Sequence, residues 1–502
     1  MFSYTSCGKS YARSKTVKTK LSRRTFLGQM GVALGVMCLP GRSTVAVSAD
    51  KHPNIILMMA DDMGWGDVGF NGGKIIQTPH LDDMAAAALK FTRFYSGAPV
   101  CSPTRGSCLT GRHPFRYGIY SANQGHMKPE ELTLPELLKK LGYATGHFGK
   151  WHLGTMTPDY SGKASREPEK HYSTPGMNGF DEWFSTEFAV ATWDPYDPSH
   201  SHLSRKTKWD TRALYWHNGV NVTEGLEGDD SKIVMDKALP FIENAVDRKK
   251  PFFTVIWFHA PHAPVVGGPE FLKLYEAYEE DSRHYYACIT ALDRQVGRLR
   301  KALLDLRVTE NTMIFFCSDN GPEGDKQGGR NAGSAGSFRG RKRSLFEGGI
   351  HVPGLLEWPD RIKPGSVTDY PAVTSDYLPT ILEVLGVEMP DARPIDGISL
   401  IPVIEENRKQ RPAPIAFETI GGFGSKSSRT SPRTALIDNR FKLLTDFDPG
   451  GKGDMLFDLI DDPGETHNLI GEHPIIVEKM KRTLKVWRES CQKSDGGGDY
   501  RP

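Results

Sequence analysis

Cysteine is scarce in this sequence, with seven residues in a chain of 502. Two of the seven stand in the first 49 residues, and the other five are Cys101, Cys108, Cys288, Cys317 and Cys491. Their spacing matches neither the framework of a small disulfide-rich protein nor the paired ligands of a zinc site. Because five is odd, at least one of them is unpaired or modified if the chain is exported.

Acidic side chains are missing from the first 49 residues. This stretch carries eight lysines and arginines in all, five of them before the segment SRRTFL. A mild apolar run follows that segment, and VSA stands before Asp50. That order of basic, apolar and small residues predicts an export signal over 1–49, and the Arg23-Arg24 pair is typical of the twin-arginine type. The alternative is a plain basic tail. The signal implies export machinery of the twin-arginine route as a partner, and a periplasmic or extracellular location in a bacterium.

Long apolar runs are missing too. No stretch reaches the roughly 18–20 apolar residues that a membrane span needs, so we expect no membrane span. Removing the signal also removes eight positive charges, which takes the net charge from +2 to about −6. Proteins that bind nucleic acid are usually basic, so we expect no nucleic-acid partner.

Four short apolar runs, rich in branched and aromatic residues, each end at a polar cluster. They cover residues 54–60, 142–149, 251–258 and 311–317. Runs of this length predict buried strands. Helical patterns lie around and between them, over 80–95, 132–142, 231–248 and 284–307. Strands that alternate with helices predict an α/β fold, with a large mainly parallel central sheet flanked by helices.

The pattern changes after residue 400. Short strand-like runs followed by one helical stretch predict a smaller C-terminal subdomain over 401–492, made of an antiparallel sheet and a closing helix. The larger catalytic domain then spans 50–400. We expect the glycine-rich end of the chain, 493–502, to be disordered.

Acidic and amide side chains follow two of the predicted strands. Asp61 and Asp62 come after the first run, and Asp319 and Asn320 after the last. The carboxyl ends of parallel strands meet at one edge of a sheet, where ligands bind. Calcium and magnesium prefer such oxygens, so the four residues fit one cation site. The alternative is that they only form turns, which Asp and Asn favour anyway.

Basic side chains follow the two other strands. Lys150 and His152 come after the second run, and His259 and His262 after the third. The histidine spacing is not that of a helical zinc motif. A cation together with lysine and histidine at strand ends predicts binding of an anionic tetrahedral ester.

A glycine-rich stretch over 328–349 is also basic. It contains Arg339, Arg341, Lys342 and Arg343, but it lacks the spacing of a phosphate-binding loop. One or two of these charges fit an anion clamp, and the others fit a solvated loop.

The stretch VCSPTRGSCLTGRHP, residues 100–114, is the most specific motif. A lone cysteine is usually a small buried residue, but Cys101 begins a C-x-P-x-R segment followed by L-T-G-R, as in the sulfatases. GYATGHFGKWHLG, PNIILMMADDMGWGD, CSDNGP and FRGRKRSLFEGG resemble further blocks of that family, in the same order. From about Pro53 to beyond Glu347 the chain resembles formylglycine-dependent sulfatases of the alkaline-phosphatase-like superfamily.

This resemblance implies a role for each of these residues. A formylglycine-generating enzyme would read Pro103 and Arg105 and oxidise Cys101 to formylglycine. The hydrated aldehyde has two hydroxyls on one carbon: one attacks sulfur, and the second lets the aldehyde reform and expel sulfate. The resemblance also implies a calcium ion bound by Asp61, Asp62, Asp319 and Asn320, with residue 101 beside it. Arg105 and His152 would orient the hydrate. Lys150, His262 and Lys342 would hold the sulfate.

His262 or Lys342 would also protonate the leaving alcohol. The blocks are closest to the arylsulfatase A and N-acetylgalactosamine-6-sulfatase branch, which favours a sulfated sugar or polysaccharide as substrate. Three alternatives remain open: an aryl sulfate hydrolase, a phosphate or phosphonate ester hydrolase of the same superfamily, and a non-catalytic binder of sulfated glycans.

Overall fold

The computed structural model describes residues 52–161, 165–197, 215–420, 431–447 and 450–500. The predicted export signal lies outside these ranges. The described residues belong to one compact unit that begins at Lys51. Within them, no helix has the length and apolar character to cross a membrane.

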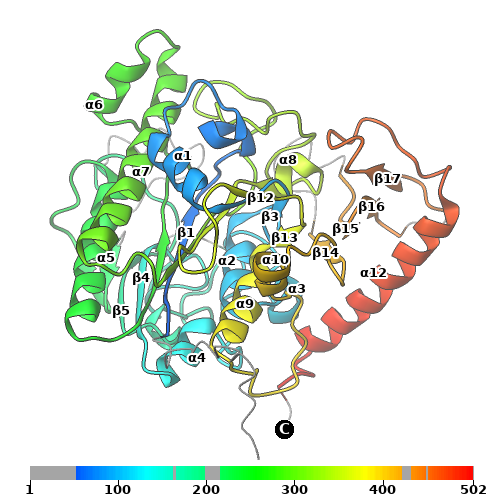
Figure 1. The fold of residues 1–502 in the computed structure, drawn as a ribbon, viewed down its shortest axis with the longest axis horizontal. Helices are drawn as coiled ribbons and strands as arrows, with labels where there is room; N and C mark the ends of the chain where they lie inside the picture. Colours follow the sequence, from blue (N-terminus) through cyan, green and yellow to red (C-terminus); the bar gives the residue numbers. More distant parts are fainter. Residues whose placement is uncertain (1–51, 162–164, 198–214, 421–430, 448–449, 501–502) are drawn as a thin grey trace, which may run out of the picture. The chain divides into compact units, whose positions relative to one another are not determined.

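A ten-stranded sheet forms the centre of this unit (Figure 1). Its strand order is β12-β2-β11-β9-β1-β8-β4-β5-β6-β7. In that order the strands cover Ser366–Thr368, Leu89–Phe91, Gly354–Glu357, Thr312–Ser318, Asn54–Ala60, Phe252–Trp257, Ala144–Lys150, Glu182–Thr186, Tyr215–His217 and Val220–Val222. The five strands from β9 to β5 are mutually parallel, so the predicted fold class is confirmed. The four predicted strands are β1, β4, β8 and β9, which lie at the centre of the ten-stranded sheet.

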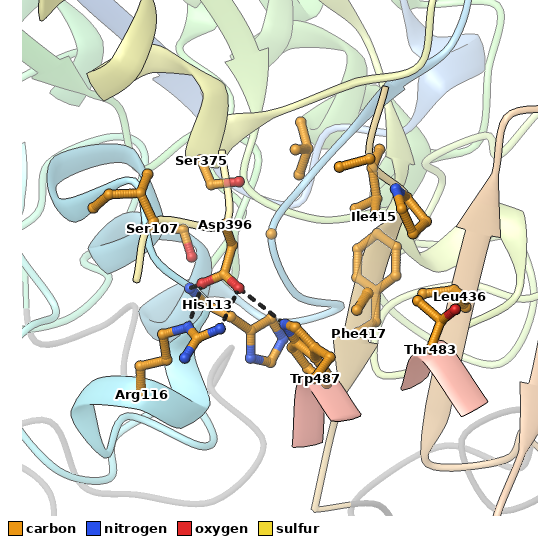
Figure 2. A pocket seen from close by; sticks show the side chains of 16 residues that line it. Ser107, His113, Arg116, Ser375, Asp396, Ile415, Phe417, Leu436, Thr483 and Trp487 are labelled. Carbon is orange, nitrogen blue, oxygen red and sulfur yellow. Dashed lines mark hydrogen bonds and ion pairs between the residues drawn. The ribbon is translucent and has the colours of Figure 1, made fainter. Parts of the chain in front are cut away.

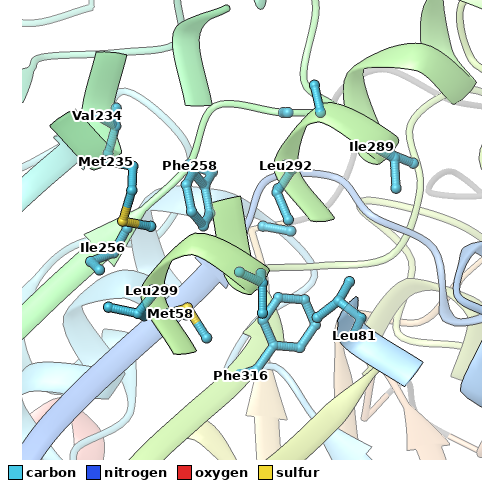
Figure 3. Packing of buried hydrophobic residues seen from close by; sticks show 14 of the residues in the cluster. Met58, Leu81, Val234, Met235, Ile256, Phe258, Ile289, Leu292, Leu299 and Phe316 are labelled. Carbon is cyan, nitrogen blue, oxygen red and sulfur yellow. The ribbon is translucent and has the colours of Figure 1, made fainter. Parts of the chain in front are cut away.

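Alternate residues of β1 face opposite sides of the sheet, as the pleat requires. Ile56 and Met58 pack with helices α1 (Pro79–Ala87), α5 (Asp230–Asp247) and α7 (Glu280–Asp305) on one face. Figure 3 shows Met58 beside Leu299 of α7 in this cluster. Ile55, Leu57 and Met59 pack on the other face.

Helices α2 (Cys101–Thr110), α4 (Leu134–Lys140) and α9 (Tyr377–Val384) cover that second face. Shorter helices are α3 (Pro114–Tyr117), α6 (Pro269–Leu272), α8 (Glu347–Ile350) and α10 (Ile401–Glu406). The helix predicted over 80–95 is wrong in its second half, because Ala88 is extended and the chain continues into β2 and β3 (Phe94–Tyr95). Phe91 and Phe94 are buried there, and aromatic residues favour strands. β3 pairs with β10 (His351–Val352) and β13 (Ala372–Val373) in a small sheet.

The C-terminal region contains a separate antiparallel sheet. Its strands are β14 (Ile415–Glu418), β15 (Thr434–Asp438), β16 (Phe441–Thr445) and β17 (Met455–Asp458), and helix α12 (Pro474–Asp495) packs against them. The other face of this sheet shares a hydrophobic cluster with Tyr95 and Phe346. The predicted antiparallel sheet and closing helix are therefore present, and this cluster packs them against the rest of the unit. The division at residue 400 stays a prediction.

The prediction of a disordered tail from residue 493 is wrong as far as Tyr500. Helix α12 continues to Asp495. Arg112 donates a hydrogen bond to Asp499 at 2.7 Å, and the hydroxyl of Tyr500 donates to Glu131. Buried partners far away in the sequence hold this segment, and its own composition gives no sign of them.

Candidate active site

Two parallel strands bring the predicted acidic residues together. Ala60 at the end of β1 is in register with Ser318 at the end of β9. The residues that follow them therefore start side by side, and the backbone N–H of Asp62 donates to Oδ1 of Asp319 at 3.0 Å. The side chains of Asp61, Asp62, Asp319 and Asn320 are all buried.

Three oxygens of this acidic cluster have no hydrogen-bond partner although they are buried: Oδ1 of Asp61, Oδ2 of Asp62 and Oδ1 of Asn320. Buried polar atoms are normally paired, and leaving one unpaired costs about 1–3 kcal/mol. Donor atoms of Asp61, Cys101 and Asp319 lie within 4.8 Å of one another, as do those of Asp61, Asp62 and His262. These oxygens are the ligands that a hard cation prefers, so the residues present fit a calcium ion.

Three cationic side chains lie against the carboxylates. Nζ of Lys150, at the end of β4, donates to Oδ2 of Asp61 at 2.5 Å, and Nζ of Lys342 donates to Oδ1 of Asp62. Arg105 donates to Oδ2 of Asp319 at 2.7 Å and lies 3.3 Å from Oδ2 of Asp61. Three carboxylates thus face three cations, which is the pairing that buried charges require.

The pKa values of two of these carboxylates shift in opposite directions. Burial raises the pKa of Asp319 to about 7, with the charge of Asp61 adding to this effect and Arg105 opposing it. Burial would also raise the pKa of Asp62, but Lys342 and His262 hold it below its usual range. Burial and the charge of Asp61 thus outweigh Arg105 at Asp319, whereas Lys342 and His262 outweigh burial at Asp62.

Cys101 is the first residue of α2 and is buried beside the acidic cluster. Burial raises the pKa of its thiol, against the lowering effect of Lys150 and Lys342. An unmodified thiol at this position is therefore protonated, unlike the thiolate nucleophile of a thiol protease. All five cysteines of the described residues are free.

His262 is the most accessible of the predicted site residues, with 24% of its side chain exposed. Its Nδ1 is bonded to the carbonyl oxygen of Ala263 at 2.7 Å, and its Nε2 lies 3.7 Å from Oδ2 of Asp62. Burial lowers its pKa to about 3, with Asp62 acting in the other direction. The ring therefore presents Nε2 at the opening of the site.

His152 is buried and has a positive φ of 61°. Its Nε2 lies 2.8 Å from Oδ1 of Asn123, and its Nδ1 is buried without a partner. Arg166 donates to the carbonyl oxygen of His152 at 2.8 Å. Burial lowers the pKa of the ring well below its usual value, and the nearby charges of Lys150 and Arg166 add to this.

His259, to which the resemblance assigns no role, is held by two other side chains. Its Nδ1 is bonded to Asp230 at 2.8 Å and its Nε2 to Thr186 at 2.7 Å. Both ring nitrogens are thus occupied inside the protein. In this respect His259 differs from His152 and His262.

The structure adds two residues that the sequence analysis missed. Glu323 binds the guanidinium of Arg343 through both oxygens, at 2.7 and 2.8 Å, and lies 3.7 Å from Nζ of Lys342. Asn123 contacts His152. Both residues lie in loops outside the quoted motifs, and no spacing in the sequence pointed to them.

A cavity of about 260 Å³ lies elsewhere, between α2, β14 and α12. None of the predicted site residues lines it. Figure 2 shows Asp396 at one side, bonded to Arg116, His113 and Trp487. The polar groups there bond to one another. The cavity lies where the C-terminal sheet and α12 meet the larger part of the unit.

Comparison with known proteins agrees with this geometry. The sulfatase family model matches residues 53–387, and a model of the C-terminal region of N-sulphoglucosamine sulphohydrolase matches residues 333–490. N-acetylgalactosamine-6-sulfatase of Homo sapiens is 36% identical over 380 residues, covering 72% of this chain and 68% of that protein. Arylsulfatase A of Homo sapiens is 32% identical over 464 residues, covering 84% of each chain.

Solved structures share the fold over most of the chain. Ps i-CgsB has a TM-score of 0.74 and 28% sequence identity, covering 88% of this chain and 94% of that one, and it has also been solved in complex with k-i-k-neocarrahexaose. The phosphonate monoester hydrolase of Agrobacterium radiobacter has a TM-score of 0.59 and 20% identity, covering 88% and 96%. That second likeness concerns the fold alone.

Proposed function

Because the chain belongs to the sulfatase family and is thus a sulfuric ester hydrolase, we propose that it removes sulfate from a sulfated sugar or polysaccharide. We further propose that it uses a formylglycine formed from Cys101 and one bound calcium ion. The observation that carries this proposal is the buried acidic cluster beside Cys101, with its three unpartnered oxygens and its three paired cations.

The charge balance of the cluster supports an anionic substrate. The carboxylates of Asp61, Asp62 and Asp319 are matched by Arg105, Lys150 and Lys342. A calcium ion held by the unpartnered oxygens would supply two further positive charges and polarise a sulfate oxygen. A site of net positive charge without bulk water favours a sulfate ester over a neutral one.

Each cationic side chain has a task in this proposal. Lys150 is bonded to Asp61 and Lys342 to Asp62, and each lysine has further N–H groups to donate to sulfate oxygens. Arg105 and His152 orient the modified residue 101.

His262 lies at the opening of the site, where a leaving sugar oxygen departs. Because its pKa is about 3 and its Nδ1–H is donated to Ala263, its Nε2 carries no proton at neutral pH, so of the two candidates Lys342 protonates that oxygen.

Formylglycine accounts for the position of Cys101. A buried thiol with a raised pKa is a poor nucleophile, whereas the hydrated aldehyde supplies a hydroxyl nucleophile and a second hydroxyl for release of sulfate. This requires a formylglycine-generating enzyme as a partner. Cys108 lies on the same helix and is also buried. Arg112 follows it at the same spacing as Arg105 follows Cys101, but Thr110 stands where the motif requires proline, so Cys108 provides a matched control.

The sugar class is supported by the relatives. N-acetylgalactosamine-6-sulfatase is named for a sulfated sugar, and Ps i-CgsB was solved with a carbohydrate. A phosphate or phosphonate ester hydrolase remains the second candidate, because the phosphonate monoester hydrolase has the same fold.

The test is release of inorganic sulfate or phosphate from a panel of esters. The panel contains sulfated galactans, fucans, galactosaminoglycans, an aryl sulfate and a phosphonate monoester. The protein is produced with a formylglycine-generating enzyme, and mass spectrometry of the residue-101 peptide measures conversion. We expect sulfate release from one glycan class, loss of release in Cys101→Ala, and retention in Cys108→Ala. Converted protein that releases only phosphate would replace the proposal with the second candidate.

We also propose export by the twin-arginine route, on the basis of the first 49 residues. That route carries folded proteins, so modification and folding can precede export. The test is expression of the full chain in a bacterium, followed by cell fractionation and N-terminal sequencing. Replacement of Arg23 and Arg24 by lysine should retain the uncut chain in the cytoplasm, and export that persists would contradict the proposal.

A further inference from the structure

Asn123 is a loop residue whose side chain and backbone both make hydrogen bonds around the site. Oδ1 of Asn123 is bonded to Nε2 of His152 at 2.8 Å. Its backbone N–H donates to the hydroxyl of Ser102 at 3.2 Å, and its carbonyl oxygen accepts from Ser165 at 2.7 Å. Asn123 therefore joins the residue after Cys101 to the histidine of the site.

The bond to His152 fixes the position of a proton. An amide oxygen only accepts hydrogen bonds, so Nε2 of His152 must carry the hydrogen. In a neutral ring, Nδ1 then has a free lone pair. That atom is the buried nitrogen without a partner, and the charges of Lys150, Arg105 and His262 act on the same ring.

The backbone contacts support the same arrangement. Asn123 and His152 both have a positive φ, of 59° and 61°, a conformation that Asn tolerates better than most residues. Arg166 binds the carbonyl of His152 and not its ring. The side chain of Asn123 is thus the ring's own hydrogen-bond partner in the described part of the chain.

We propose that Asn123 is a positioning residue that keeps the proton of His152 on Nε2 and leaves Nδ1 as an acceptor inside the site. This inference rests on the proposed sulfatase function for its catalytic consequence, since the acceptor would take a hydroxyl proton of the modified residue 101. A partner that orients a histidine ring in this way typically contributes about 10–100-fold in activity.

The kinetic test compares Asn123→Gly with Asn123→Asp. Glycine tolerates the positive φ but has no acceptor, whereas aspartate keeps an acceptor oxygen. We expect the glycine variant to lose about 100-fold in kcat with little change in KM, and the aspartate variant to stay within about tenfold of the parent. Asn407→Gly, at a remote helix end with a φ of 54°, should leave both constants unchanged.

Two measurements separate positioning from a structural effect. Formylglycine content and melting temperature are recorded for each variant. In a His152→Ala background, Asn123→Gly should cause no further loss of kcat, because its effect passes through the ring. The proposal would be overturned if kcat of the double variant fell by the product of the two single-variant losses. It would also be overturned if Asn123→Gly kept kcat within twofold of the parent.

A third measurement reads the tautomer of His152 by NMR and does not depend on enzyme activity. Protein labelled with ¹⁵N-histidine is compared with a His152→Gln variant, which assigns the ring signals. We expect the Nε2–H form in the parent and a mixture in Asn123→Gly. The Nδ1–H form in the parent would refute the role of Asn123, whatever ester the enzyme hydrolyses. Converted protein that shows the expected tautomer but releases no sulfate would count against the proposed function alone.

Discussion

Nζ of Lys442, on β16 of the C-terminal sheet, lies 2.9 Å from Oε1 of Glu347 on α8. Both side chains are buried, and Glu465 lies 2.9 Å from the same Nζ. Burial would raise the pKa of Glu347, but Lys442 and His351 lower it to about 2. Burial raises that of Glu465 to about 7. One lysine thus serves two buried carboxylates, and it ties the C-terminal sheet to the helix that follows the Lys342 loop.

Lys442→Met should therefore be strongly destabilising. Removing one member of a buried ion pair leaves an uncompensated charge, and we expect the free energy of unfolding to fall by about 3–5 kcal/mol. Urea denaturation at pH 7 measures this. Adding Glu465→Gln to the variant should restore part of the loss, while Lys479→Met, at an exposed pair, should change stability by less than about 1 kcal/mol. Equal effects at positions 442 and 479 would contradict this account.

Removal of the metal should abolish activity without unfolding the protein. The carboxylates of the acidic cluster already face three cations, so the metal-free state has no large charge imbalance. We expect dialysis against a chelator to lower the melting temperature by a few degrees and sulfate release by at least about 100-fold, with recovery on adding calcium. Elemental analysis by plasma emission spectroscopy should find one calcium ion per active chain. Full activity in protein shown to hold no metal would disprove the calcium proposal.

Lys150→Met should affect catalysis more than folding. Lys150 is bonded to Asp61 at 2.5 Å, and Arg105 lies 3.3 Å from the same carboxylate, so the substitution leaves Asp61 one cationic neighbour. We expect kcat to fall by about 100–1000-fold, because a charge that stabilises the transition state is lost, and stability to fall by about 1–3 kcal/mol. Lys139→Met, at an exposed pair with Asp181, is the control. If the variant keeps more than a tenth of the kcat of the parent, the role of Lys150 is wrong.

The sequence predicted the acidic cluster because parallel strands have simple geometry. An apolar run that stops at Asp61 and another that stops at Asp319 must place both residues at one sheet edge, whatever the loops do. The same reasoning placed Lys150 at the end of β4. These positions depend on local periodicity alone, which a single sequence contains.

Other features depend on contacts between distant segments. Helix α1 ends at Ala87 because the next residues pair with β11 and β12. The tail is held by Arg112 and Glu131, and Asn123 meets His152 only after folding. In each case the deciding partner is remote in the chain, so the local pattern either misleads or says nothing.

His113 should make the protein less stable in mild acid. It is buried at the cavity of Figure 2, close to Asp396 and Arg116, and burial lowers its pKa to about 3 although Asp396 acts in the other direction. An unfolded histidine binds a proton near pH 6.5, so below that value the unfolded state holds a proton that the folded state lacks. The stability is complete above pH 6.5 and is lost progressively as the pH falls toward 3. For this residue alone we expect about 3 kcal/mol between pH 7 and pH 4. Urea denaturation across this range should show a smaller pH slope in His113→Asn than in the parent. His467→Asn, at an exposed site, should keep the parental slope, and parallel profiles for all three proteins would show that His113 is not responsible.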